Sequence, residues 1–191
     1  MCISRRQHGM TLIELIVFIV IVSVALVGVL TVLNITAKSS ADPMVRKQAL
    51  AIAEAVLEEV MLQPFTWCDP DDPNAATATG TAGCTAGYVE ASGPETIATV
   101  VETRLSATTP FDNVNDYANL SLPSPILSST GSFSAPLGYS ATVAVSSEAL
   151  NGVGDATPAS ASLRISVTVT KGGESIVLES YRTRYSPNFT P

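Results

Sequence analysis

The sequence predicts an α+β fold in which a long N-terminal helix packs, along its outer half, on an antiparallel β-sheet. Three observations support this fold class: a charge-free run of 19 residues from Leu15 to Leu33, apolar residues at helical spacing over positions 45–60, and alternating apolar and polar residues in the last third. With 191 residues, the chain has room for one ordinary domain plus an extension, which excludes a large multidomain enzyme.

The run from Leu15 to Leu33 is long enough to cross a membrane. As a helix it would span about 28 Å, close to the roughly 30 Å hydrocarbon core of a bilayer. Arg5 and Arg6 precede the run, so the positive-inside rule predicts a cytoplasmic N-terminus and an extracytoplasmic body. A cleaved secretory signal is the alternative, but the run exceeds the roughly 7 to 15 apolar residues of such signals, and no A-x-A-like site follows it.

Glu14 lies directly before this run, and a simple signal anchor would leave it unexplained. A carboxylate that faces lipid costs several kcal/mol unless it is paired. Ionisable residues at such positions usually mark a functional site. We therefore expect Glu14 to act in something other than membrane insertion.

The residues around Glu14 follow a specific order. A basic leader, RRQHG at residues 5–9, is followed by MTLIE at residues 10–14 and then by the apolar run. This order resembles the class III leader of type IV prepilins and type II secretion pseudopilins. The resemblance implies that a membrane aspartyl peptidase cleaves between Gly9 and Met10, that Met10 becomes N-methylated, and that Glu14 is the helix carboxylate used in subunit assembly. Met10 stands where this family most often has Phe.

The resemblance also implies a location and partners. The chain would be a single-pass protein of the bacterial inner membrane, with a cytoplasmic N-terminus and a periplasmic body, and would reach the cell surface in a pilus. Its partners would be the prepilin peptidase, the inner-membrane pilus assembly machinery and, through the N-terminal helix, other pilins, major and minor. In a filament, Glu14 would pair with the α-amino group of a neighbour's Met10, because each ion offsets the other's loss of hydration.

A second helical stretch is expected after a polar break at residues 34–40. Asp42 can cap it, and Pro43 is tolerated in a first turn, where it could bend or break a continuous helix. Pro64 disfavours helix in the residue before it, so the stretch should end at Gln63. The apolar face that we expect on the sheet comprises Val45, Ala49, Ile52, Val56 and Val60. A coiled-coil seam is the alternative, but the heptads are not sustained.

These boundaries divide the chain into a basic leader peptide (1–9), the transmembrane half of the helix (10–36), its amphipathic half (37–63) and an extracytoplasmic head (64–191). The head begins with a long loop, because residues 65–88 are rich in Asp, Pro, Gly, Ala and Thr.

Cys68 and Cys84 lie in this loop and are the cysteines that remain if Cys2 leaves with the leader. An extracytoplasmic location favours a disulfide between them. In the chain-entropy model, closing a loop of this length stabilises the fold by about 3 kcal/mol. Zinc is the alternative, but the single His8 is in the leader, so the further ligands that zinc needs are missing.

The C-terminal third has the pattern of β-strands. Alternation predicts one strand over residues 139–145 and a hairpin over residues 162–184, with Gly172-Gly173 at the centre of its turn. The inward positions would be Tyr139, Ala141, Val143 and Val145 on the first strand and Leu163, Ile165, Val167 and Val169 on the next. Residues 109–136 are loop-rich, and no element is predicted there.

No catalytic machinery is expected. The mature chain would contain no His, and the G-x-S-x-G, G-x-x-x-x-G-K and H-E-x-x-H motifs are absent, so we expect neither an enzyme nor a cofactor. Two acidic groups are weak candidates for calcium, the alternative being ordinary turn chemistry, because neither has EF-hand spacing. The first comprises Asp69, Asp71 and Asp72 with Asn74, and the second Asp112 and Asp116 with Asn113 and Asn115.

Net charge excludes one class of partner. The formal charge is −7, and nine acidic residues but no Lys or Arg lie between Gln48 and Glu102. A surface so acidic repels phosphates, so we expect no nucleic-acid binding.

Three short segments carry a finer resemblance: SADP at 40–43, LQPF at 62–65 and FDNVNDY at 111–117. They are similar to the D-subunit minor pilins of the mannose-sensitive haemagglutinin (MSHA) type IV pilus. The expected function is that of a minor pilin, a structural subunit that primes, caps or joins a filament used in attachment or motility. The alternatives are a minor pseudopilin of type II secretion and a membrane-anchored binding module that never polymerises.

Overall fold

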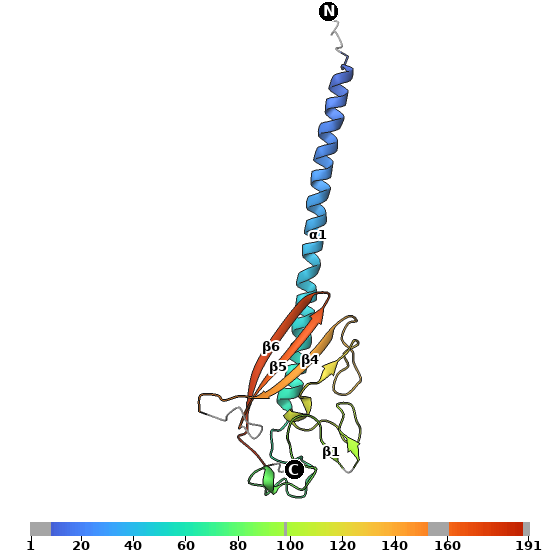
Figure 1. The fold of residues 1–191 in the computed structure, drawn as a ribbon. Coiled ribbons are helices and arrows are strands. Elements are labelled where there is room, and N and C mark those ends of the chain that lie inside the picture. The colour runs from blue at the N-terminus through green and yellow to red at the C-terminus, as the bar shows by residue number, and fades with distance from the viewer. Residues whose placement is uncertain (1–8, 98, 153–160, 189–191) are drawn as a thin grey trace, which may run out of the picture. The chain divides into compact units, whose positions relative to one another are not determined.

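The computed structural model describes residues 9–97, 99–152 and 161–188, and its described part contains one long helix and antiparallel sheets (Figure 1). The chain divides into two compact units, Met1–Met44 and Val45–Pro191; we call the second the head unit. The predicted α+β class is confirmed. The elements are helix α1 (Leu12–Leu62), the 3₁₀ helices η1 (Thr81–Gly83) and η2 (Val114–Tyr117), and strands β1 (Thr96–Ile97), β2 (Val100–Val101), β3 (Ser121–Leu122), β4 (Ser140–Ser147), β5 (Ser162–Lys171) and β6 (Glu174–Thr183).

The first unit contains the apolar part of α1. It includes a candidate membrane span of 25 residues, Leu12–Thr36, whose most apolar 18-residue window has a mean hydropathy of 3.2, so this stretch is long and apolar enough to cross a membrane. Two of its hydroxyl groups donate within the helix, Ser23 to the carbonyl of Ile19 at 2.7 Å and Thr31 to that of Val27 at 2.8 Å. Because these bonds satisfy the hydroxyl groups, the polar residues do not conflict with an apolar environment.

Helix α1 runs without interruption through the polar segment that follows, with Pro43 inside it. The predicted long N-terminal helix is therefore confirmed and is continuous through residues 34–40, whereas the expectation that Asp42 caps a second helical stretch is wrong. The physical reason is that proline removes one N–H donor and bends a helix, which the neighbouring turns can tolerate. The helix ends at Leu62, one residue before the predicted end.

The core of the head unit lies between α1 and a four-stranded antiparallel sheet of order β3-β4-β5-β6 (Figure 1). The helix contributes Ala49, Ala53, Val56 and Val60, all at most 4% exposed, while Val45 and Ile52 are half-buried beside them. The predicted apolar face thus packs on the sheet, as expected, and not in a coiled-coil seam. The sheet contributes Ala141, Val143, Leu163, Ile165, Val167 and Val169.

The predicted hairpin is confirmed as β5 and β6. Its register pairs Lys171 with Glu174, and the two residues between them, Gly172 and Gly173, have φ angles of 58° and 95°. Glycine adopts such angles without steric penalty. Residues 109–136, for which the sequence predicts no element, contain η2 and the short edge strand β3, which pairs with β4.

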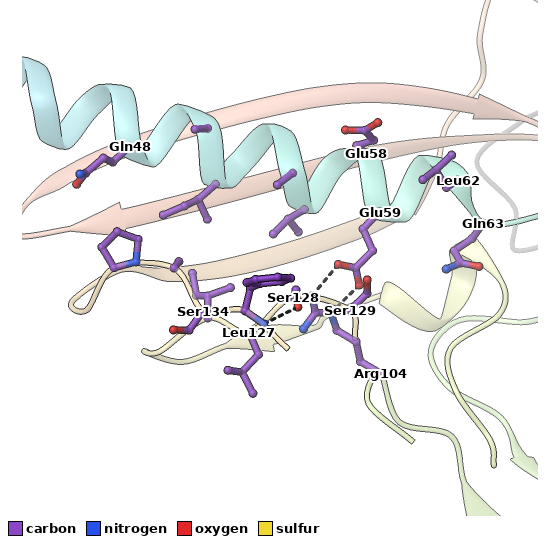
Figure 2. A pocket seen from close by; sticks show the side chains of 18 residues that line it. Gln48, Glu58, Glu59, Leu62, Gln63, Arg104, Leu127, Ser128, Ser129 and Ser134 are labelled. Atoms are coloured by element: carbon purple, nitrogen blue, oxygen red, sulfur yellow. Dashed lines mark hydrogen bonds and ion pairs between the residues drawn. The ribbon is translucent and has the colours of Figure 1, made fainter. Parts of the chain in front are cut away.

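A groove of about 660 Å³ separates the head-unit part of α1 from the loop of residues 126–136 (Figure 2). At one end, Arg104 binds Glu59 with two bonds of 2.6 Å, from Nε to Oε1 and from one terminal guanidinium nitrogen to Oε2. The hydroxyl group of Tyr117 also donates to Glu59 Oε1, at 3.0 Å. This pair joins the helix to the loop after β2, and it leaves Glu59 fully partnered.

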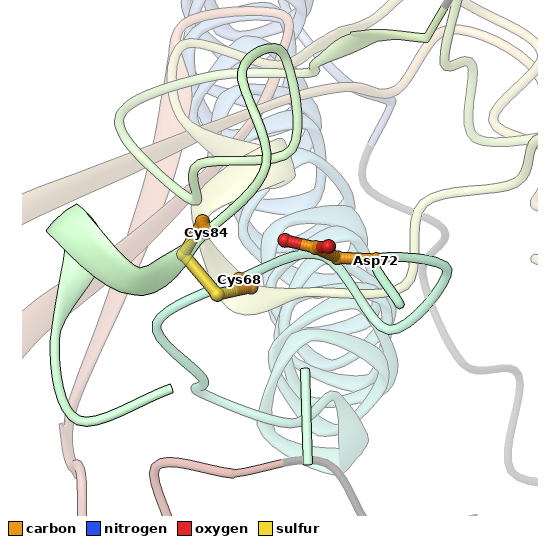
Figure 3. A group of neighbouring side chains, drawn as sticks. All are labelled: Cys68, Asp72 and Cys84. Carbon is orange, nitrogen blue, oxygen red and sulfur yellow. A yellow bond between two sulfur atoms is a disulfide. The ribbon is translucent and has the colours of Figure 1, made fainter. Parts of the chain in front are cut away.

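The loop after α1 is closed by a disulfide between Cys68 and Cys84 (Figure 3), the link that the sequence predicts. Asp72 lies beside it and accepts three hydrogen bonds of 2.7 to 2.9 Å, from the backbone N–H of Asn74 and from the N–H and hydroxyl group of Thr85. Burial tends to raise the pKa of Asp72, but these bonds hold it below its usual value. Asp72 therefore fixes the segment that carries Cys84.

Thiol labelling tests the disulfide. In non-reducing conditions, the full chain should label once, at Cys2, and a chain that has lost its leader should not label at all. The free energy of unfolding of the Cys68→Ser/Cys84→Ser double variant should be about 3 kcal/mol lower than that of the wild type, because the unfolded chain gains the conformational freedom of an open loop. Quantitative labelling of both loop cysteines in the wild type would contradict the prediction.

Candidate functional sites at the N-terminus and in the head unit

The first candidate site is the junction that precedes α1. Gly9 and Met10 are exposed and lie outside the helix, and a side chain at Gly9 would contact nothing else in the described chain within 4 Å. Thr11 directly precedes the helix and caps it: the Glu14 N–H donates to the Thr11 carbonyl at 3.1 Å and to its hydroxyl oxygen at 3.4 Å, and the Leu15 N–H donates to the same carbonyl at 3.2 Å. The Gly9-Met10 bond therefore lies in accessible chain, where a protease could reach it. Arg5 and Arg6 lie outside the described residues.

Glu14 is exposed in the first turn of α1. The N-terminus of a helix carries unpaired N–H groups and a partial positive charge, which favour a carboxylate there. The apolar residues that follow are exposed as well, for example Phe18 at 61% and Val24 at 69%. An apolar helix of this kind requires lipid or other helices around it.

The second candidate site is a group of six carboxylates in the head unit, which we call the acidic cluster. Its members come from three segments that are remote in sequence and meet at one place. They are Asp69, Glu90, Glu95, Glu102, Asp112 and Asp116. Five of the six are at most 8% exposed, and Asp112 is half-buried.

Backbone hydrogen bonds bring the first two segments together. Residues 67–69 run antiparallel to residues 88–90, with Asp69 N–H bonded to the Tyr88 carbonyl at 3.0 Å and Glu90 N–H bonded to the Trp67 carbonyl at 3.2 Å. Next along the chain, the hairpin of β1 and β2 places Glu95 beside Glu102, whose N–H donates to the Glu95 carbonyl at 3.1 Å. Two glutamates thus flank the base of one hairpin.

The third segment contains η2. Asp116 accepts backbone N–H bonds from Asp112 at 2.9 Å and Asn113 at 2.8 Å, which completes a capping box with Asn113. The Asn115 amide group donates to the Glu90 carbonyl at 3.4 Å. One oxygen of Asp116 is therefore used by the cap, while its other oxygen is buried without a partner among the described residues.

The acidic cluster contains two triads. Asp69, Glu102 and Asp112 each bring a carboxylate oxygen within 4.8 Å of the others, and Glu90, Glu95 and Asp116 do the same. Burial is the largest cause that raises the pKa of all six carboxyls, and repulsion among neighbouring carboxylates adds to it. The pKa of Glu90 rises to about 11, those of Glu102 and Asp116 to about 8, and that of Asp112 to about 7.

The two acidic groups that the sequence offers as calcium candidates do not form two separate sites in the structure. Asp69, Asp112 and Asp116 belong to the acidic cluster, whereas Asp71 is exposed and Asp72 fixes the disulfide loop. Cys68, Asp72 and Cys84 also lie together (Figure 3), but the disulfide removes the thiolates that zinc would need. Sequence reasoning missed the roles of Glu90, Glu95 and Glu102, whose only signal is their position in a stretch without Lys or Arg.

The raised pKa values predict how stability depends on pH when divalent cations are absent. In an unfolded chain these carboxyls lose their protons near pH 4, whereas the folded chain keeps those of Asp112, Glu102 and Asp116 until about pH 7 to 8. The folded state binds more protons, so its stability should fall as the pH rises through this window. Fluorescence of the single Trp67 can follow thermal unfolding of the full chain in detergent with EDTA.

The unfolding midpoint should be several degrees lower at pH 8 than at pH 5, since each kcal/mol corresponds to about 2–4 °C. Glu102→Gln should reduce the difference because it removes one titrating group. Glu54→Gln, which alters an exposed carboxylate of α1, should leave it unchanged. A midpoint that is equal or higher at pH 8 would contradict the argument.

Comparison with known proteins bears on the segment that contains the first candidate site. Residues 4–30 match the family described as the prokaryotic N-terminal methylation motif. No curated protein and no solved structure in these comparisons matches the chain. The matched segment contains Gly9, Met10 and Glu14 together with most of the apolar helix. The chain therefore carries the N-terminal motif of type IV pilin-like and pseudopilin-like proteins, which indicates a structural subunit, and its apolar helix fits a single-pass membrane anchor.

Proposed function

We propose that this chain is a minor type IV pilin that the prepilin peptidase processes between Gly9 and Met10 and that then joins a filament through α1. Its N-terminus would lie in the cytoplasm and its head unit in the periplasm until assembly. The observation that carries the proposal is the order of three features at the N-terminus. An accessible Gly9-Met10 bond is followed by a capped helix start, and then by an exposed Glu14 that precedes an exposed apolar helix.

The surroundings of Glu14 support an assembly role. A carboxylate in the first turn of α1 is close to where cleavage would create a new α-amino group, at Met10. When apolar helices bundle, such an amine and the Glu14 of a neighbouring copy or another pilin could neutralise each other, which neither ion could achieve alone in a dry environment. The pair would set the axial register between subunits.

The head unit supports a specialised position in the filament. It carries a disulfide loop and an acidic cluster in addition to the sheet that packs on α1. This elaboration, with the likeness of residues 40–43, 62–65 and 111–117 to MSHA D-type minor pilins, favours a subunit that primes or caps the filament. Neighbouring genes distinguish this proposal from a minor pseudopilin, because a pilus cluster supports the first and a secretion cluster the second.

Processing is the first test. Mass analysis of membrane-derived protein from cells with the peptidase should show Met10 as a methylated N-terminus. Gly9→Val should block cleavage while the chain still folds, because a side chain at position 9 meets no described atom within 4 Å. The same Met1 terminus with and without the peptidase would remove the proposal.

Glu14 is the second test. Glu14→Leu should leave expression, cleavage and membrane localisation intact but reduce recovery of other pilins from detergent extracts and the number of pili. Glu14→Gln, which keeps the shape without the charge, should have a weaker effect. Glu54→Leu is the matched control, because it removes an exposed carboxylate from the head-unit part of the same helix. Equal partner recovery and equal piliation in Glu14→Leu would favour the plain membrane-anchored binding module.

A further inference from the structure

The acidic cluster contains buried carboxyl groups that lack hydrogen-bond partners. Glu90 is 1% exposed, and among the described residues neither of its carboxylate oxygens has a hydrogen-bond partner. The other five carboxylates each have one buried oxygen that also lacks a hydrogen-bond partner among the described residues: those of Asp69, Glu95, Glu102, Asp112 and Asp116. Folded proteins pair nearly all such groups, because an unpaired buried carboxylate is strongly unfavourable.

The nearby cations do not balance this charge. Arg104 is bound to Glu59 on the helix. The positive charge of Arg184 acts on Glu90, but its guanidinium group stacks on the rings of Phe65 and Trp67, at 3.9 Å from each centroid. One arginine cannot neutralise six carboxylates.

The atoms that the acidic cluster offers as ligands indicate which metal ion it could bind. Every ligand atom in the two triads is a carboxylate oxygen, which suits hard cations and not zinc or copper. Calcium accepts six to eight oxygen ligands at about 2.3–2.6 Å in irregular geometry, so oxygens up to about 4.8 Å apart can share one ion. Magnesium needs a near-ideal octahedron and usually keeps several waters, which fits a buried carboxylate set poorly.

We propose that the acidic cluster binds calcium, with Asp69, Glu102 and Asp112 as one ligand set and Glu90, Glu95 and Asp116 as the other. Two triads offer places for two ions, and the proposal requires at least one. A bound ion would join the loop after α1, the β1-β2 hairpin and the η2 segment, which otherwise meet through a few hydrogen bonds of the backbone and of the Asn113 and Asn115 side chains. Calcium would therefore stabilise this part of the head unit, independently of any role in a filament.

The test uses the full chain in detergent at pH 8 after EDTA has been removed. Isothermal titration should show at least one Ca²⁺ bound per chain, and CaCl₂ at a concentration well above the dissociation constant should raise the Trp67 unfolding midpoint by about 5 °C or more. MgCl₂ at the same concentration should give less than half of this shift. Glu54→Gln should behave like the wild type.

Glu90→Gln and Glu102→Gln remove one carboxylate from each triad. The variant of a triad that holds an ion should weaken calcium binding there at least tenfold and reduce the calcium-dependent shift. Without calcium, Glu90→Gln should unfold at about the same or a higher temperature than the wild type, because an amide of similar shape replaces a buried carboxyl group that has no hydrogen-bond partner among the described residues; this result would show that the variant folds. The proposal is overturned if the wild type binds no calcium at about 1 mM, the weak end for extracellular modules, if Glu90→Gln and Glu102→Gln both respond like the wild type, or if magnesium gives an equal shift.

Discussion

The head unit depends on the contact between α1 and the four-stranded sheet. Ala49 and Ala53 present small side chains to the strands, so the backbone of the helix can approach closely, and Val56 and Val60 continue the same face. Tyr139 adds a polar anchor, since its hydroxyl group donates to Gln48 Oε1 at 2.7 Å, while Lys171 lies over its ring at 4.1 Å. This contact buries most of the apolar surface of the unit and fixes both ends of the long segment between helix and sheet.

That segment is held differently, because it has few apolar residues to bury. Its second, small core contains Cys68, Ala75 and Ala78 with Trp67 and Cys84 beside them. Polar interactions hold the rest of the segment in place: the hydrogen bonds to Asp72, the capping box of η2 and the Glu59-Arg104 ion pair. The stability of a region that is held by polar groups depends on the charges of those groups, whereas that of a packed apolar core does not.

Local patterns in the sequence predicted the elements that depend on short-range order. The apolar run, the face from Ala49 to Val60 and the Gly172-Gly173 turn each follow from spacing within one element. Whether Pro43 interrupts the helix could not be predicted locally, because the penalty at one position is set against the helical residues on both sides, and the structure keeps Pro43 inside a continuous helix. The acidic cluster was only partly predictable: Glu90, Glu95 and Glu102 are isolated in sequence, and only the pairing of residues 67–69 with 88–90 and the β1-β2 hairpin bring them together.

The disulfide links the order of this segment to its compartment. Cys68 and Cys84 close a loop whose two ends lead directly into Asp69 and toward Glu90. Before oxidation, the chain must bring these carboxylates together against their mutual repulsion and against the freedom of an open loop. The covalent link removes much of that freedom. In the proposed periplasmic location of the head unit, its maturation would consequently be favoured after export and delayed in the reducing cytoplasm.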